Sequence, residues 1–260
     1  MTESWNRING LALSRIVTGI KPGWRRLRER IKGNSQDNPE DTFLPSDISL
    51  SPLLTERFTS LWTRMQRSTQ KQRLIIQITS ARGKEGRTTM VFLAGRTLAS
   101  SNLGDFLLID SDVYHSDLHS LLQVESSPGL LDLFQGQSTL EEVIKPTAFP
   151  HLYLLPLGSS LPINQAQILI SQNIGALLEE LRNNYDCILI DSPPINLSSL
   201  SEINGTYSDG TILVVRANFT RREVIQAAIK ALENDGVVIS GVVLNRRKFA
   251  IPEFIYRRMK

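Results

Sequence analysis

The sequence contains a single cysteine among its 260 residues and no long uninterrupted apolar run. One thiol, Cys187, excludes an intramolecular disulfide framework and suits a reducing cytosol. No segment approaches the roughly 20 apolar residues that a bilayer-spanning helix requires. The N-terminal region is interrupted by Arg7, Arg15 and Lys21 and has no cleavage-like end, so we expect no secretory signal. The three histidines lack ligand-like neighbours, and we therefore expect no zinc site.

The composition is that of a globular protein, and the charge is unevenly distributed along the sequence. Hydrophobic content of 41% and charged content of 21% suit one large α/β domain with an appendage. The net charge of +3 divides into +6 for residues 1–36, +5 for residues 246–260 and −8 for the residues between them. Basic ends on an acidic body predict contacts of those ends with an anionic surface, such as lipid headgroups or an acidic partner. We expect no nucleic acid as a partner.

Composition also divides the chain into segments. Residues 1–36 predict a basic amphipathic extension, in which Trp24–Lys32 is a short helix candidate of the kind found at membrane interfaces. A solvated extension explains the same composition equally well. Residues 37–50 are largely polar, contain Pro39 and Pro45, and predict a linker. The main domain is expected over residues 51–248, followed by a basic tail over residues 249–260.

A β-branched run, Ile75–Thr79, precedes a small polar loop and an apolar-periodic segment from Thr88 to about Ser100. Strand, glycine-containing loop and helix form the context of a P-loop, where backbone N–H groups and a helix N-terminus bind phosphate. The residues predicted to bind a nucleotide here are Gly83, Lys84, Glu85, Gly86, Arg87, Thr88 and Thr89.

The eight positions of the G-x-x-x-x-G-K-[ST] pattern run from Ala81 to Thr88, with arginine at the lysine position. Arg87 keeps the positive charge but is longer, planar and forked, so it is not equivalent to lysine. Two interpretations remain open: Arg87 still binds phosphate in a modified NTPase, or catalysis is lost and the fold persists as a binding module. A third interpretation is that the segment is a glycine turn in an ordinary βα unit that binds no ligand.

Carboxylates follow two apolar runs. Phe106–Asp110 leads into Asp110-Ser111-Asp112, and Tyr185–Asp191 ends in the Walker B pattern of a hydrophobic strand closed by aspartate. Ligands of open α/β sheets collect at the carboxyl ends of strands. We therefore predict that Asp110, Asp112 and Asp191 meet a bound Mg²⁺ or its waters.

Strands alternate with helical patterns along the chain. Strands are predicted at 74–79, 106–110, 151–156, 185–191, 211–215 and 237–244, and helices at 51–67, 88–100, 167–183 and 222–233, with short helices within 117–145. This alternation predicts an α/β fold with a doubly wound, mostly parallel sheet.

Several blocks also carry a family resemblance: Ile78-Thr79-Ser80, Leu108–Asp112, Pro128–Asp132 with Gly136, Leu140–Ile144, Leu155–Gly158, Tyr185–Pro194 and Gly241–Asn245. In this order and spacing they resemble the cytoplasmic domain of the bacterial protein-tyrosine kinases (BY-kinases) of capsule and exopolysaccharide export. The resemblance covers about three-quarters of the chain, from about Ser51 to Asn245.

The resemblance implies a P-loop NTPase fold related to the partitioning ATPases, with ATP and Mg²⁺ as cofactors. Thr88, Asp110, Asp112 and Asp191 match the family's metal positions. The catalytic positions match Arg87, Asp110, Asp112 and Asp191, and Asn245 matches the residue near the adenine. The resemblance further implies autophosphorylation of a C-terminal tyrosine cluster, ring-shaped oligomers, activation by a membrane chain-length-determinant protein and a cytoplasmic location at the inner face of the membrane.

The sequence departs from the family pattern at several places besides Arg87. The usual Pro-Gly-Glu-Gly of the loop reads Gly83-Lys84-Glu85-Gly86. Tyr114 stands where the second motif has arginine, and Thr59 and Trp62 replace the ring-contact arginines that follow Glu56. The tail contains one tyrosine, Tyr256, in place of a cluster.

These departures favour a degenerate tyrosine-autokinase-like protein with weakened ATP binding. It would act as a regulator or assembly partner in exopolysaccharide or capsule synthesis or export, as a homo- or hetero-oligomer at the membrane. The alternative is an active ATP-dependent tyrosine kinase in which Arg87 replaces the usual lysine in binding the phosphates. A partitioning-type ATPase is the second alternative, since Arg82 occupies the place of an extra lysine in those enzymes.

Overall fold

The computed structural model describes residues 52–101 and 103–246. The predicted extension (1–36), linker (37–50) and tail (249–260) lie outside the described residues. Within the described ranges, no helix combines the length and the apolar character needed to cross a bilayer.

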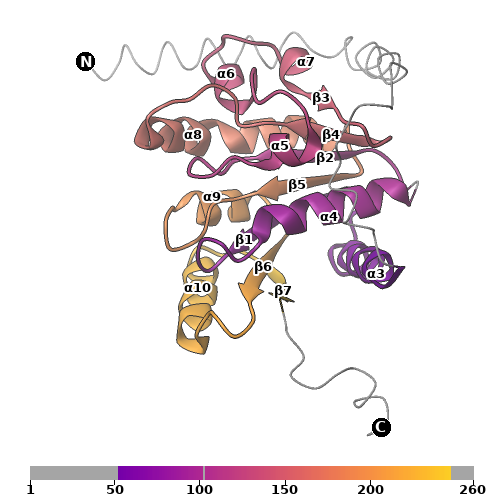
Figure 1. Cartoon of the computed structure of the whole chain (residues 1–260), viewed down its shortest axis with the longest axis vertical. Helices are drawn as coiled ribbons and strands as arrows, with labels where there is room; N and C mark the ends of the chain where they lie inside the picture. The colour runs from indigo at the N-terminus through magenta and orange to yellow at the C-terminus, as the bar shows by residue number, and fades with distance from the viewer. Residues whose placement is uncertain (1–51, 102, 247–260) are drawn as a thin grey trace, which may run out of the picture.

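A seven-stranded sheet in the order β3-β4-β2-β5-β1-β6-β7 forms the centre of the molecule (Figure 1). The strands are β1 (Leu74–Ser80), β2 (Phe106–Asp110), β3 (Lys145–Pro146), β4 (Leu152–Leu155), β5 (Cys187–Asp191), β6 (Gly210–Arg216) and β7 (Ile239–Asn245). Every pairing is parallel except that of β3 with β4. The predicted doubly wound, mostly parallel sheet is therefore confirmed.

Helices connect the strands and cover both faces of the sheet. They are α3 (Pro52–Thr69), α4 (Arg87–Ser100), α5 (Leu118–Leu122), α6 (Leu130–Phe134), α7 (Leu140–Val143), α8 (Ile163–Arg182), α9 (Leu200–Thr206) and α10 (Arg222–Asn234). The central strands are buried on both faces, which explains why they read as continuous apolar runs in the sequence.

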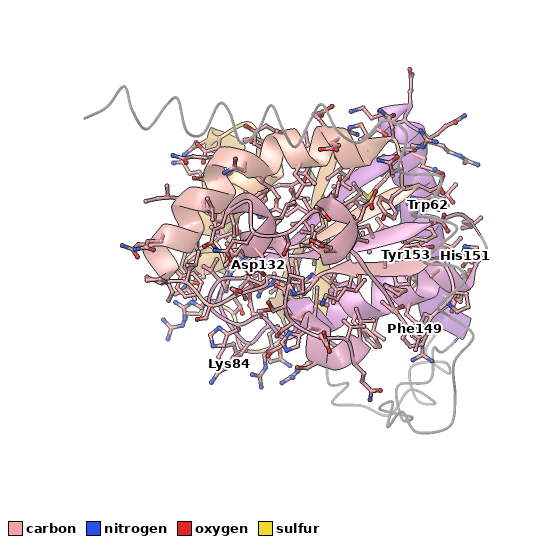
Figure 2. All side chains as sticks on the ribbon, turned by 90° about the horizontal axis from the view of Figure 1, so that it is seen from above. Trp62, Lys84, Asp132, Phe149, His151 and Tyr153 are labelled. Carbon is pink, nitrogen blue, oxygen red and sulfur yellow. The ribbon has the colours of Figure 1, made fainter. Side chains whose placement is uncertain are left out.

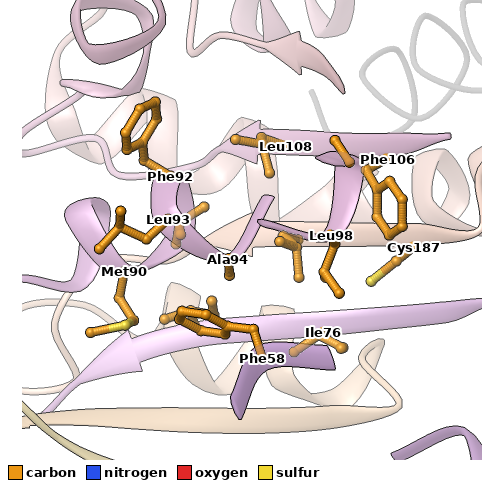
Figure 3. Packing of buried hydrophobic residues seen from close by; sticks show 14 of the residues in the cluster. Phe58, Ile76, Met90, Phe92, Leu93, Ala94, Leu98, Phe106, Leu108 and Cys187 are labelled. Carbon is orange, nitrogen blue, oxygen red and sulfur yellow. The ribbon is translucent and has the colours of Figure 1, made fainter. Parts of the chain in front are cut away.

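Alternate residues of each strand enter two separate cores. Ile76 and Leu108 pack with α3 and α4 on one face (Figure 3), whereas Ile75 and Leu107 pack with α8 on the other. Cys187 belongs to the first core, and burial raises the pKa of its thiol. The single cysteine is thus a small core residue, as its apolar surroundings in the sequence predict.

Two short elements were not predicted, and β5 and β7 each start two residues later than expected. The strand β3 has only two residues, one of them Pro146, and α9 has seven. Neither is long enough to show a hydrophobic period. The strand β5 begins at Cys187 and not at Tyr185, and just before it the side chain of Asp186 accepts the backbone N–H of Asp105 at 2.9 Å.

Candidate nucleotide site

The carboxyl ends of β1, β2 and β5 meet at one edge of the sheet. Asp110 lies opposite Asp191 in the β2–β5 register, and Ile78 lies opposite Asp191 in the β1–β5 register. The P-loop follows β1 directly, so the three parallel strands place both aspartates beside it. Asp112, two residues beyond β2, shares an arginine partner with Asp191. The convergence expected from the strand-end pattern is therefore present.

Gly86 closes the P-loop and caps α4 in a left-handed conformation with φ of 88°. A Cβ at this position would lie 2.2 Å from Nδ2 of Asn245. That amide donates to the backbone carbonyl of Glu85 at 2.8 Å. Asn245 therefore fixes the loop from the end of β7, and its predicted place near an adenine stays a prediction.

Glu85 is buried, with its carboxylate turned into the protein. Oε2 accepts the N–H of Arg82 at 2.8 Å. Oε1 accepts the N–H of Arg216 at 3.3 Å and the hydroxyl of Thr220. Sequence analysis placed Glu85 among the nucleotide-binding residues, but its side chain ties the loop to the end of β6.

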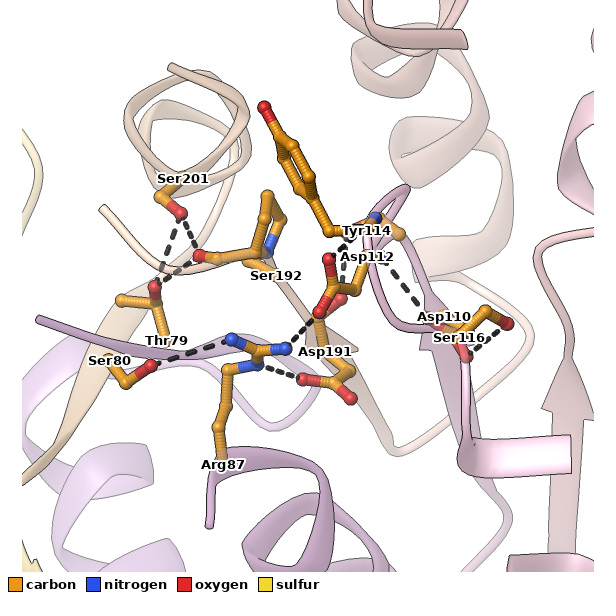
Figure 4. Close-up of polar contacts among 12 residues, drawn as sticks. Thr79, Ser80, Arg87, Asp110, Asp112, Tyr114, Ser116, Asp191, Ser192 and Ser201 are labelled. Carbon is orange, nitrogen blue, oxygen red and sulfur yellow. Dashed lines mark hydrogen bonds and ion pairs between the residues drawn. The ribbon is translucent and has the colours of Figure 1, made fainter. Parts of the chain in front are cut away.

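Arg87, at the lysine position of the pattern, points away from the loop toward the acidic strand ends (Figure 4). Its Nε donates to Oδ1 of Asp191 at 2.6 Å, and its Nη2 donates to Asp112. Nη1 makes a long contact of 3.4 Å with Oγ of Ser80. The side chain is only 7% exposed, so the guanidinium is a buried counter-ion to two carboxylates.

Burial and charge set the ionisation of this cluster. Burial alone would lower the pKa of Arg87, but attraction to Asp191 and Asp112 outweighs it and raises the pKa above its ordinary value. Burial raises the pKa of Asp191, and the charge of Arg87 opposes this rise only in part. Asp110 accepts the Ser116 hydroxyl at 2.9 Å, yet burial and the charge of Asp191 hold its pKa well above the ordinary value.

A cleft of about 590 Å³ opens beside the P-loop. All seven loop residues predicted to bind a nucleotide line it, together with Ser80, Asp112, His115, Asp117, Pro194, Arg216 and Arg246. Asp110, Asp191 and Asn245 do not line it. Sequence analysis missed Arg216 and Arg246, although both follow or end strands at the same carboxyl edge and the strand-end rule could have found them.

The geometry and the comparisons agree on the family. A family model described as an AAA domain matches residues 73–235. The tyrosine-protein kinase CpsD of Streptococcus agalactiae serotype III is 31% identical over 192 residues, which cover 74% of this chain and 82% of CpsD. The chain belongs to the bacterial tyrosine-protein kinase family. The tyrosine-protein kinase Wzc of Salmonella typhi is 28% identical over 201 residues, and this BY-kinase chain matches 27% of the length of Wzc.

Solved structures place the fold in the same family. The VpsO kinase domain is 29% identical with a TM-score of 0.67, and the match covers 75% of this chain and 96% of that domain. The septum site-determining protein MinD of Pyrococcus horikoshii, solved with Mg-ADP, is 25% identical with a TM-score of 0.59 over 71% of this chain and 76% of MinD. The BY-kinase fold and its relation to P-loop NTPases are thus shown.

The acidic cluster of this BY-kinase chain does not fit a divalent cation as it stands. The guanidinium of Arg87 takes up one oxygen of Asp112 and one of Asp191, while Asp110 binds Ser116. Within residues 52–101 and 103–246, no three His, Cys, Asp or Glu side chains are arranged to hold a metal ion. The second oxygen of Asp191, Oδ2, is buried without a hydrogen-bond partner among the described residues. Mg²⁺ in nucleotide sites is usually held by one or two carboxylates together with waters and phosphates, and here the guanidinium already engages both candidate carboxylates.

Lys84 stands at a loop position where the BY-kinase pattern has glycine, and its φ is 65°. Figure 2 shows its side chain at the edge of the molecule opposite Trp62 and Phe149. A left-handed conformation costs a residue with a Cβ about 1–2 kcal/mol. We expect Lys84→Gly to raise the free energy of unfolding by about 0.5–1 kcal/mol, measured by urea denaturation.

Lys230→Gly is the matched control for this variant, since Lys230 lies within α10 in a right-handed helix. The same change there should lower the free energy of unfolding by about 1 kcal/mol. Equal destabilisation by both substitutions would show that the conformation of Lys84 carries no strain.

Proposed function

We propose that this chain is a degenerate member of the BY-kinase family that binds a nucleotide without kinase turnover. The observation that carries the proposal is the direction of Arg87. Arg87 lines the cleft, but its guanidinium is paired with Asp112 and Asp191 and is not available as a free phosphate-binding point charge. The same contacts occupy the carboxylates that match the family's metal positions.

The energetic argument concerns the transition state. Phosphoryl transfer depends almost entirely on positioning and on cations that stabilise the developing charge. Removing one preorganised stabilising group typically costs about 10²–10³ in rate. Here Arg87 and the carboxylates of Asp112 and Asp191 neutralise one another. The stabilisation of the transition state by the loop cation and by a carboxylate-bound metal ion is therefore reduced in both cases. Binding is less affected, because Gly86, Thr88 and the N-terminus of α4 still face the cleft.

The test is autophosphorylation and ATP hydrolysis by the full chain with Mg²⁺ and ATP. The native protein should show no phosphotyrosine and no hydrolysis above background. Arg87→Lys should raise hydrolysis by about tenfold or more, because the shorter lysine cannot span both carboxylates. Arg64→Lys, an exposed position on α3, is the control and should leave the background unchanged. Phosphate on Tyr256 or on any other tyrosine of the native chain would overturn the proposal in favour of an active kinase.

The role that suits such a protein is that of a regulator or assembly partner in exopolysaccharide or capsule synthesis or export. The support is family membership together with a folded P-loop core. We place it in the cytoplasm, peripheral at the inner face of the membrane, beside a chain-length-determinant-type membrane protein and in a homo- or hetero-oligomer. The basic segment 1–36 would contact the anionic lipid surface. The partitioning-ATPase alternative has weaker support, since MinD matches with the lower TM-score of 0.59.

A further inference from the structure

The cleft has an internal cation in addition to its acidic cluster. Arg87 lines the P-loop cleft, and its guanidinium contacts Asp191 and Asp112 from a buried position (Figure 4). Asp112 in the lining of the cleft, with Asp191 behind it, would repel a triphosphate, and a divalent cation ordinarily offsets such repulsion. In this chain the guanidinium offsets it from within the protein.

Four basic side chains, those of Lys84, Arg87, Arg216 and Arg246, and three acidic ones, those of Glu85, Asp112 and Asp117, line the cleft itself. Lys84, Arg216 and Arg246 line it along with the N-terminus of α4. The guanidinium of Arg216 stacks on Phe219 at 4.6 Å from the ring centroid, which holds this charge beside the cleft. Glu85 is engaged by hydrogen bonds and Asp112 by Arg87, so Lys84, Arg216 and Arg246 are the charges that can attract a polyphosphate, opposed by Asp117.

We propose that this site binds the polyphosphate of a nucleotide without a divalent cation, with Arg87 as a permanent counter-ion to Asp112 and Asp191. The inference rests on the proposed function and specifies that the nucleotide is bound free of a metal ion. It also explains why an arginine occupies a position where lysine would be expected. A forked guanidinium can contact two carboxylates together, whereas an ammonium acts as a single point charge.

A metal ion competes poorly for these carboxylates. Arginine remains protonated throughout the physiological range, so Arg87 cannot leave by losing its proton. Mg²⁺ gives up its own water reluctantly and demands near-octahedral oxygen geometry. Entry of Mg²⁺ would require displacing a buried guanidinium from Asp191 and Asp112. The two carboxylates are already neutralised by that guanidinium, so the exchange would bring little additional electrostatic stabilisation.

Calorimetric titration of the full native chain with ATP tests the proposal directly. We expect the same dissociation constant, within about twofold, in EDTA and in millimolar Mg²⁺, because the metal adds no ligand contact. Titration with Mn²⁺ alone, followed by electron paramagnetic resonance, should show no bound ion. Tight binding that appears only with Mg²⁺, or Mn²⁺ bound by the native chain, would overturn the inference.

Variants at position 87 give an independent readout. In Arg87→Lys, Asp112 or Asp191 is freed, and ATP affinity in EDTA should fall about tenfold or more below that in Mg²⁺. This variant should also bind Mn²⁺. Arg64→Lys should behave as the native chain does. If the native chain binds no ATP in either buffer, the inference fails together with the nucleotide-binding part of the proposed function, while the absence of kinase turnover stands. Phosphotyrosine in the native chain would instead refute the proposed function.

Discussion

Replacing Arg87 with methionine is expected to lower the free energy of unfolding by about 3–5 kcal/mol at neutral pH, because removing one partner of a buried ion pair leaves an uncompensated charge. Methionine fills a similar volume, so the loss reports the charge and its hydrogen bonds and not a cavity. Two carboxylates, Asp112 and Asp191, lose their buried cation together. Urea denaturation at several pH values measures the effect.

The pH dependence of this loss has a definite sign. Burial raises the pKa of Asp191 even with Arg87 present, and removing the guanidinium removes a cause that lowers it. A carboxyl group whose pKa is higher in the folded than in the unfolded state contributes stability below its unfolded pKa of about 3.9, and this contribution is lost as the pH rises through the folded pKa. The deficit of Arg87→Met should therefore be small near pH 4–5 and grow toward pH 8.

Arg64→Met provides the control, since Arg64 is exposed on α3 and should change stability by less than about 0.5 kcal/mol at any pH in this range. A deficit in Arg87→Met that stays constant with pH would show that packing, and not charge, is responsible. A deficit no larger than that of the control would show that the buried ion pair contributes nothing to the fold.

The sequence was sufficient to predict where the acidic residues gather. A hydrophobic run that ends in Asp110 or Asp191 places a carboxylate at the end of a buried strand, and parallel strands bring such ends to one edge. No contact needed to be known in advance, because the parallel register of the strands is enough to bring these carboxylates together. The same reasoning predicted the P-loop from the strand, loop and helix that contain it.

The directions of the loop side chains could not be predicted in this way. A P-loop pattern states which residues are near a ligand, and both Glu85 and Arg87 were assigned to it on that basis. In the fold, the carboxylate of Glu85 accepts the backbone N–H of Arg216, which is 131 residues away, and the guanidinium of Arg87 donates to Asp112, which is 25 residues away. A long charged side chain takes the strongest buried partner within reach, and that partner is fixed by tertiary structure alone.

Glu85→Ala should lower the free energy of unfolding by about 2–4 kcal/mol, since a buried carboxylate that accepts hydrogen bonds contributes about 1.5–3 kcal/mol per charged bond and its donors would be left unpaired. The donors are the N–H groups of Arg82 and Arg216 and the hydroxyl of Thr220. Arg216 is the last residue of β6 and Thr220 lies just beyond it, so the P-loop would lose its attachment to the end of that strand.

A matched control is available in Glu142, whose carboxylate also accepts a backbone N–H, that of Thr139, at 2.8 Å. Glu142 is exposed at the start of α7, so Glu142→Ala should cost only about 0.5–1 kcal/mol, the usual value of a surface cap. Both variants are measured by urea denaturation and by calorimetric titration with ATP. Glu85→Ala should weaken ATP binding by about tenfold or more, because the loop must then be ordered at the expense of binding energy. Equal costs for the two substitutions would show that the buried carboxylate does not hold the loop.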